Sequence, residues 1–343
     1  MRIALDATYS VGDELSGVGL YSREMLNGLA AARPGVWFDF YYRPHRYWKS
    51  RAERLPVNAR RRLLLEPLGP RSADLVHGLN QRLPRMPLRR AVTTFHDLFV
   101  LTGEYSTPEF RARFAALARD AAARSSLIIA VSAFTKSQVM ELLDVEPDRI
   151  RVIHHGVREL AYPLDAPREN VILNVGVIQK RKNIEHLVEA FESVERNWRL
   201  VLAGSRGYGS EEIMARIKAS PARDRISVLG YVSHEELAGW YARARIFAFP
   251  SLDEGFGMPV LEAMAAGTPV VTSNRSALPE VAGDAAILVD PEDPQALARA
   301  LRSLSEDEKL WRDMSWRSAA RAHLFSWDEA VRKTWQVYRE VLG

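Results

Sequence analysis

Short runs rich in β-branched and aromatic residues alternate with helical patterns along this chain. In the first half we expect strands at RIALDAT, WFDFYYR, ADLVHGL, AVTTFHD and LIIAVS, and helices at GVGLYSREMLNGLAAA, PEFRARFAALARDAAARS and AFTKSQVMELLDV. Strands that alternate with helices favour a mainly parallel sheet with helices on both faces. The first half therefore predicts a doubly wound α/β domain.

The same pattern restarts after residues 158–170, a stretch with two prolines and no periodicity. Strands are expected at VILNVGV, RLVLAGS, RISVLGY, RIFAFPS, PVVTSN and AAILVD, with helices between them. We predict two α/β domains, residues 1–160 and 168–326, and an aromatic helix at 327–343 that packs back onto the first. Because ligands bind beyond the carboxyl ends of parallel strands, two such sheets would face an interdomain cleft.

Length and composition agree with two folded domains. The chain has 343 residues, 47% of them hydrophobic, enough for two cores of about 150 to 170 residues each. The absence of cysteine excludes disulfides, thiol catalysis and cysteine-ligated zinc. No uncharged apolar run approaches the ~20 residues that a membrane-spanning helix needs. We therefore expect a cytoplasmic protein.

Positive charge is concentrated between residues 43 and 90. This segment holds thirteen Arg or Lys and three Asp or Glu, although the whole chain has a net charge of only +4. Tyr47, Trp48 and three consecutive leucines are interleaved with the charges. The pattern fits an ordinary solvated face, or a patch for an anionic membrane surface or a lipid-diphosphate acceptor, which would place the protein at the inner face of the membrane. Nucleic acid is not expected, because no recognition helix or RNA-binding strand accompanies the charge.

Residues 251–274, SLDEGFGMPVLEAMAAGTPVVTSN, combine a glycine-rich loop with a short helix. Pro259 suits a first helical turn and Gly267 suits a helix stop, which predicts a helix over about 258–266. The free N–H groups at the start of a helix bind phosphate, and glycines before it let a ligand approach the backbone.

Two glutamates flank that helix start. Glu254 lies in the loop, and Glu262 lies between Leu261 and Ala263 in a helix with no other charge. A helix cap and a solvent-facing glutamate are the ordinary explanations. Taken together, the pair favours a nucleotide-sugar site, in which Glu254 binds the sugar hydroxyls and Glu262 binds the ribose.

The two glutamates match the E-x7-E signature of the retaining glycosyltransferases of family 4 type (glycosyl transferases group 1), which the chain resembles along nearly its whole length. The resemblance also includes SGVGLYS, FHDLFVLTGEYS, IIAVSAFTKSQVMELLDVEPDRIRVIHHGV, NVGVIQKRKNIEHLVEAF and ILVDPEDPQALARAL. It implies the GT-B fold, in which two Rossmann-like domains face a cleft and the second holds the donor. It also implies that no metal or other cofactor is needed.

Three cations, Lys180, Arg181 and Lys182, follow the expected strand VILNVGV and precede a helix. Cations are disfavoured at a helix N-terminus, so an anionic partner is expected. The resemblance implies that Arg181 and Lys182 bind the donor diphosphate. There they would stabilise the charge that develops on the leaving group.

In the first domain, His96 ends the strand AVTTFH, where a side chain would face the cleft. A buried histidine with satisfied hydrogen bonds is the ordinary alternative. The resemblance implies that His96 lies near the donor sugar and that Gly17 and Gly19 approach the donor phosphates and the acceptor. Relatives commonly have asparagine at the position of His155, so no role is assigned to it.

The resemblance implies a wider donor-binding set in the second domain. Tyr231 and Val232 match a stretch whose backbone meets the nucleobase. The other expected donor-binding residues are Gly204, Ser205, Gly255, Phe256, Gly257 and Met258.

The sequence thus predicts an enzyme that moves a hexose from a nucleotide diphosphate sugar to a hydroxyl of a glycan or lipid-linked glycan, with His96, Glu254, Arg181 and Lys182 as catalytic residues. GDP-mannose is the first expectation, since the FHDLF and DEGFGMP versions of the motifs resemble mannosyltransferases, and UDP-sugars remain open. The alternatives are a sugar-nucleotide epimerase or phosphorylase on the same scaffold, or a binding protein without activity.

Overall fold

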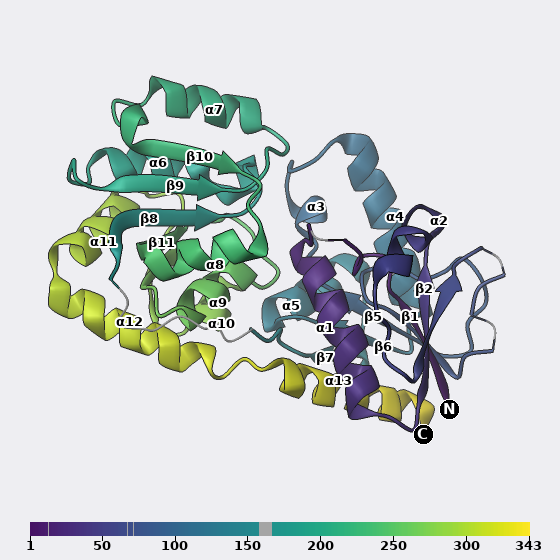
Figure 1. Ribbon diagram of the computed structural model, residues 1–343. Coiled ribbons are helices and arrows are strands. Elements are labelled where there is room, and N and C mark those ends of the chain that lie inside the picture. Colours follow the sequence, from purple (N-terminus) through teal and green to yellow (C-terminus); the bar gives the residue numbers. More distant parts are fainter. Residues whose placement is uncertain (13, 67, 71, 158–166) are drawn as a thin grey trace. The chain divides into compact units, whose positions relative to one another are not determined.

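A computed structural model describes residues 1–12, 14–66, 68–70, 72–157 and 167–343 (Figure 1). The chain divides into two compact units. Unit 1 contains Met1–Gly156 and Ser326–Gly343, and unit 2 contains Val157–Phe325. Most of the linker predicted at 158–170 lies outside the described residues.

The described part of unit 1 contains a seven-stranded parallel sheet with the order β3-β2-β1-β4-β5-β6-β7. Its strands are β1 (Arg2–Asp6), β2 (Trp37–Tyr42), β3 (Ala59–Leu63), β4 (Leu75–Gly78), β5 (Ala91–Phe95), β6 (Leu127–Ala130) and β7 (Ile150–Val152). The sequence did not predict β3 and β7. The edge strand β3 has the sequence ARRRL, and edge strands often carry charge in place of apolar alternation.

Helices of unit 1 come from both ends of the sequence. They are α1 (Gly17–Ala32), α2 (Pro44–Tyr47), α3 (Phe99–Thr102), α4 (Pro108–Arg124), α5 (Ala133–Leu143) and α13 (Trp327–Leu342). Helices α1 and α13 lie so close that a Cβ on Gly28 would stand 2.5 Å from Cγ2 of Val331. Val331, Val337 and Tyr338 join the buried cluster under α1 and the sheet. The last helix is therefore part of the core of unit 1.

The described part of unit 2 contains a six-stranded parallel sheet with the order β10-β9-β8-β11-β12-β13. Its strands are β8 (Glu169–Val175), β9 (Arg199–Ala203), β10 (Ile226–Gly230), β11 (Ala244–Phe249), β12 (Val270–Ser273) and β13 (Ala286–Val289). Its helices are α6 (Ile184–Glu192), α7 (Ser210–Ala219), α8 (His234–Arg243), α9 (Met258–Ala265), α10 (Leu278–Ala282), α11 (Pro294–Glu306) and α12 (Glu308–Ala322). The six strands expected from the second half of the sequence are all present.

Alternating strands and helices place apolar side chains between the layers of each unit. In unit 2 the main buried cluster joins the sheet to α6, α7 and α11 through residues such as Leu187, Ile213 and Leu301. Both sheets are parallel α/β sheets, as the alternation predicted. Within the part of the chain that the structure describes, none of the helices has both the length and the hydropathy of a membrane span.

Candidate functional site

The predicted donor-binding residues of unit 2 follow four strands that are neighbours in the sheet. Ser205 follows β9, Tyr231 follows β10, Lys182 follows β8 and Glu254 follows β11. These strands are adjacent in the order β10-β9-β8-β11, and all run in the same direction. The four segments therefore meet at the carboxyl edge of one sheet, where open α/β sheets bind ligands.

Glycines allow the strand ends to approach one another at this edge. Gly204 has φ +157°, and a Cβ there would stand 1.9 Å from the carbonyl oxygen of Gly176. Backbone N–H groups join the same strands, from Gly204 to the carbonyl of Gly230 (2.8 Å) and from Gly176 to that of Ala203 (2.9 Å). Gly204 is thus required by the close packing of β8, β9 and β10, whatever it also contributes to a ligand.

Arg181 and Lys182 lie in a 3-10 turn, Lys180–Lys182, that follows β8. The turn ends at Asn183, which has φ +55° and precedes α6. The backbone of Arg181 accepts hydrogen bonds from the N–H of Leu252 (2.8 Å) and the hydroxyl of Ser251 (3.1 Å). The loop after β8 is therefore attached to the loop after β11, and the cations approach Glu254.

Both cations contact one carboxylate oxygen. Oε1 of Glu254 lies 2.5 Å from Nζ of Lys182, 2.9 Å from NH1 of Arg181 and 2.6 Å from Oγ of Ser251. Arg181, Lys182 and Glu254 are buried, with 7%, 8% and 8% of their surface exposed. Nζ of Lys182 also lies 4.6 Å from the centre of the Phe249 ring. The structure thus joins three predicted catalytic residues into one buried charge cluster.

The electrostatics of this cluster keep Glu254 ionised. Burial by itself raises the pKa of Glu254, but the charges of Arg181 and Lys182 outweigh it and lower that pKa to about 2. A buried carboxylate stays charged only with partners of this kind. The same two cations are the groups in this cluster that could receive a diphosphate.

The loop after β11 leads directly into α9. Gly257 is its N-cap with φ +104°, and Pro259 lies in the first turn. The N–H of Glu254 donates to Oγ of Ser276 (3.0 Å), and its carbonyl accepts from the N–H of Ala277 (3.2 Å). Phe256 is buried, as is Gly255, while Met258 is half-buried. The start of α9 therefore lies next to the charge cluster in sequence.

Glu262 lies on α9 and is half-buried. Its Oε2 accepts a hydrogen bond of 2.8 Å from the hydroxyl of Tyr241, which lies on α8 and is buried. Burial, and then the charge of Glu262, raise the pKa of Tyr241, so this hydroxyl remains a donor. Tyr241 was not predicted, because a tyrosine in an amphipathic helix does not stand out in the sequence.

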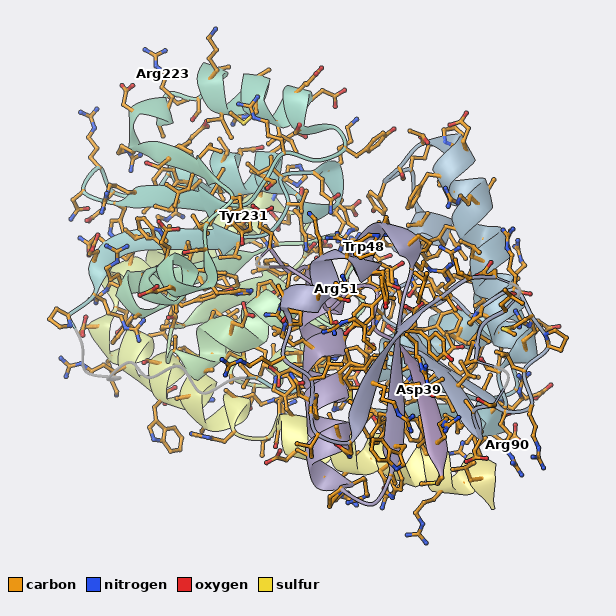
Figure 2. The ribbon with its side chains drawn as sticks, turned by 45° about the vertical axis from the view of Figure 1, so that its right-hand side comes forward. Asp39, Trp48, Arg51, Arg90, Arg223 and Tyr231 are labelled. Atoms are coloured by element: carbon orange, nitrogen blue, oxygen red, sulfur yellow. The ribbon has the colours of Figure 1, made fainter. Side chains whose placement is uncertain are left out.

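The remaining predicted residues of unit 2 are more open. Tyr231 has 46% of its surface exposed, Ser205 is exposed and Val232 is half-buried. Figure 2 labels Tyr231 on unit 2. Ser251 was missed by sequence reasoning, although it lies three residues before Glu254 and binds the same oxygen. Its position in the signature loop is the signal that could have indicated it.

In unit 1 the glycine-rich loop forms the start of α1. Ser16 is the N-cap and accepts from the N–H of Gly19 (3.3 Å), and Gly17 is the first helical residue. A Cβ on Gly19 would stand 2.8 Å from the carbonyl oxygen of Tyr9. Gly19 therefore allows the helix start to approach the loop after β1. Gly17 is exposed.

His96 directly follows β5 and is buried, with 6% of its surface exposed. Its Nε2 lies 2.9 Å from the carbonyl oxygen of Leu79, which can only accept, so Nε2 carries the proton. Burial lowers the pKa of His96 to about 4, so the ring is neutral near pH 7 and Nδ1 has a lone pair. The ring is stacked on His155 (centroids 5.4 Å apart). A histidine in this state can accept a hydrogen bond from a sugar hydroxyl.

Each unit therefore brings its own predicted residues together. Unit 2 joins the donor set at one sheet edge, and unit 1 places His96 and the start of α1 at the carboxyl ends of β5 and β1. The cleft expected between the two sheets stays a prediction. Among the described residues, no group of three or more His, Asp or Glu side chains is arranged to hold a metal ion.

Two family models match the chain. The model described as Glycosyltransferase Family 4 matches residues 16–159, and the one described as Glycosyl transferases group 1 matches residues 163–322. The chain is 33% identical to O-antigen chain mannosyltransferase B of Escherichia coli, in an alignment that covers 97% of this chain and 98% of that protein.

Solved structures share the architecture of the whole chain. Sucrose-phosphate synthase of Thermosynechococcus elongatus matches with a TM-score of 0.78 and 24% identity, over 99% of this chain and 98% of that one. Anabaena HepE in complex with UDP-glucose matches with a TM-score of 0.78 and 17% identity, over 99% and 100%. These structures, together with the two parallel sheets, show the fold predicted from the sequence.

Proposed function

The chain belongs to glycosyltransferase family 4, the glycosyl transferases group 1, and from this membership we propose that it transfers mannose from GDP-mannose to a hydroxyl group of a glycan or lipid-linked glycan precursor. The E. coli relative named O-antigen chain mannosyltransferase B supports mannose as the sugar. The motif versions FHDLF and DEGFGMP support the same choice. A UDP-sugar is the second donor to test.

The observation that carries the proposal is the charge cluster of Arg181, Lys182 and Glu254 beside the start of α9. In the proposed complex the donor diphosphate lies against the two cations and backbone N–H groups near Gly257. As the bond from sugar to phosphate breaks, the diphosphate gains charge and these donors bind it more strongly. The cations thereby do what a metal ion does in other transferases, which supports a reaction without a metal or another cofactor.

The other predicted residues receive roles that follow from their chemistry. In the free protein Oε1 of Glu254 holds the cations, and its carboxylate would also orient sugar hydroxyls when the donor is present. Glu262, held by Tyr241, would bind the ribose. His96 would accept a hydrogen bond at Nδ1 from the reacting sugar, because its Nε2 proton is already donated to Leu79.

We propose retention of the sugar's configuration. The acceptor hydroxyl would attack the face that the diphosphate leaves, and a phosphate oxygen would take its proton. The roles assigned here to the cations and Glu254 are electrostatic and orienting, so none of them requires a covalent bond between the sugar and the enzyme.

The basic segment 43–90 supports a further part of the proposal, contact with an anionic membrane. Some of its cations are occupied internally: Arg43 pairs with Glu66 (3.1 Å), and Arg61 donates to the carbonyl oxygen of Ser50 (2.7 Å). Arg51 instead lies over Trp48, which has 69% of its surface exposed; the guanidinium carbon of Arg51 is 4.8 Å from the centre of the ring. Figure 2 labels both residues on the segment after β2.

Flotation with vesicles tests the membrane contact. The Trp48→Ala and Arg51→Ala variants should float less with vesicles that contain a third phosphatidylglycerol, and the wild-type chain should not float with neutral vesicles. Equal flotation of all three proteins would contradict contact through this segment.

A product analysis tests the transfer reaction. The protein is incubated with GDP-mannose, EDTA and a mannose-terminated oligosaccharide, and the anomeric configuration of the product is read by NMR. The proposal expects an α-mannosyl product with EDTA present and without inorganic phosphate. A product that requires phosphate would indicate a phosphorylase, and free sugar without an acceptor product would indicate an epimerase.

A further inference from the structure

A chain of hydrogen bonds crosses the buried core of unit 1. The hydroxyl of Tyr338 lies 2.6 Å from Nδ1 of His77, whose Nε2 lies 2.9 Å from Oγ1 of Thr94. The hydroxyl of Tyr21 lies 2.9 Å from the same Oγ1. These residues come from α13, β4, β5 and α1, so the chain links the last helix to the first.

All four side chains are buried: Tyr338, His77 and Thr94 have 0% of their surface exposed, and Tyr21 has 2%. Burial lowers the pKa of His77 to about 3 and raises the pKa of both tyrosines, so every member is neutral near pH 7. A neutral imidazole has one donor and one acceptor nitrogen, which fits a hydroxyl on each side. Each side chain of this hydrogen-bond chain thus has a hydrogen-bond partner, and removal of one member leaves its neighbours without a partner.

The hydrogen-bond chain ends at Tyr21, beside His96. The ring of Tyr21 stands edge-on to the ring of His96, with centroids 4.7 Å apart and planes at 77°. Thr94, which holds the Tyr21 hydroxyl, lies two residues before His96, near the end of β5. The hydroxyl bond fixes where the Tyr21 ring stands, and that ring is one wall of the His96 site.

We propose that Tyr338 is a positioning residue for the sugar-transfer reaction. Its hydroxyl holds Tyr21 in place through His77 and Thr94, and Tyr21 holds the His96 ring in the orientation that presents Nδ1. This inference rests on the proposed role of His96 at the donor sugar. It makes the C-terminal helix α13 a support for the part of the reacting site that contains His96.

Helix α13 offers a matched control for a purely structural effect. Thr334 is also buried on this helix, and its hydroxyl donates to the sulfur of Met25 (3.7 Å). Neither residue belongs to the hydrogen-bond chain from Tyr338 to Tyr21. Thr334→Val removes a buried hydroxyl from the same helix without touching His77 or Tyr21. Tyr338→Phe removes only the hydroxyl at one end of the hydrogen-bond chain. Thr94→Val interrupts the hydrogen-bond chain between His77 and Tyr21 without altering α13.

The experiment measures kcat, the donor KM and the aromatic 1H–13C spectrum of the full chain. His96 is assigned from the signal missing in His96→Gln, and the ring current of Tyr21 makes that signal sensitive to the angle between the rings. Tyr338→Phe and Thr94→Val should each lower kcat about tenfold with a smaller change in KM. Both should shift or broaden the His96 signal, and Thr334→Val should do neither.

Two results would overturn the inference while leaving the proposed function intact: wild-type activity in a folded Tyr338→Phe or Thr94→Val variant, or an unmoved His96 signal in both. If Tyr338→Phe does not fold, Thr94→Val alone decides between these outcomes. Failure of the proposed function looks different, because the wild-type chain would then transfer no sugar, and failure of the role of His96 would leave His96→Gln as active as the wild-type chain. In either case the inference falls with it.

Discussion

The ammonium nitrogen of Lys182 lies 2.5 Å from Oε1 of Glu254, although 72 residues separate them in the sequence. The contact exists because β8 and β11 are neighbours and both loops leave the same sheet edge. In the free protein Glu254 thus balances the cations that we assign to the donor diphosphate. In the proposed complex the diphosphate adds an anion to this preformed cluster.

Lys182→Ala should lower kcat by about 10² to 10³, because it removes one of the two cations that bind the leaving diphosphate. It should also lower the free energy of unfolding by about 1 to 3 kcal/mol, since Glu254 keeps only Arg181 as a cationic partner. Lys180→Ala is the control: Lys180 is more exposed and pairs with Glu212 (2.7 Å). Equal turnover in the two variants would remove Lys182 from the reaction.

Glu254 should make stability depend on pH on the acid side. Its pKa is about 2 in the folded protein, and its ordinary value is 4.5. Its contribution to the free energy of unfolding is therefore fully present above pH 4.5 and is lost as the pH falls toward 2. The difference in unfolding free energy between the wild-type chain and Glu254→Gln should therefore shrink by about 3 kcal/mol over this range. Urea unfolding at several pH values measures it. A constant difference would contradict the ion pairs.

Gly204→Ala should destabilise unit 2 by about 2 to 4 kcal/mol, because its Cβ would stand 1.9 Å from the carbonyl oxygen of Gly176 at a positive φ. Gly35→Ala is a matched control, since a Cβ there meets nothing within 4 Å. Thermal unfolding of both variants gives the comparison. A melting temperature of Gly204→Ala equal to that of Gly35→Ala would show that the strand ends can separate without cost.

The fold was predictable where the spacing of apolar residues follows the period of a helix or the apolar run of a strand, as in α1 and the six strands of unit 2. It was not predictable at β3, because ARRRL contains no alternation and becomes a strand only by pairing with β2. The same limit applies to β7, which is three residues long. Short edge segments take their structure from their neighbours more than from their own side chains.

The sequence was enough to predict which residues belong to the candidate site, but not which of their atoms contact one another. The resemblance implied that Arg181, Lys182 and Glu254 serve one donor site, and residues that follow parallel strands gather at one sheet edge. The shared oxygen of Glu254 depends on loop geometry and on the hydroxyl of Ser251, and the place of Ser251 in the signature loop does not reveal that contact. The hydrogen bond from Tyr241 to Glu262 joins two helices, and the sequence did not predict it either.

Glu262→Gln should remove the protein's preference for ribose. If Glu262 binds the ribose hydroxyls, the wild-type chain should bind GDP about tenfold more tightly than 2′-deoxy-GDP, and the variant should bind both about equally. Tyr241→Phe, which removes the hydroxyl that holds Glu262, should give an intermediate ratio. Titration calorimetry supplies the affinities. An unchanged ratio in Glu262→Gln would place the ribose elsewhere.

The most direct measurement is a thermal-shift panel of GDP, UDP, ADP, GDP-mannose, UDP-glucose and UDP-N-acetylglucosamine with EDTA, on the wild-type chain and Lys182→Ala. A ligand at 100 times its dissociation constant adds about 2.7 kcal/mol of stability, which is easily seen. We predict that GDP and GDP-mannose raise the melting temperature of the wild-type chain in EDTA and raise that of Lys182→Ala much less. No shift from any nucleotide, or equal shifts in both proteins, would contradict a nucleotide-sugar site at the Lys182–Glu254 cluster.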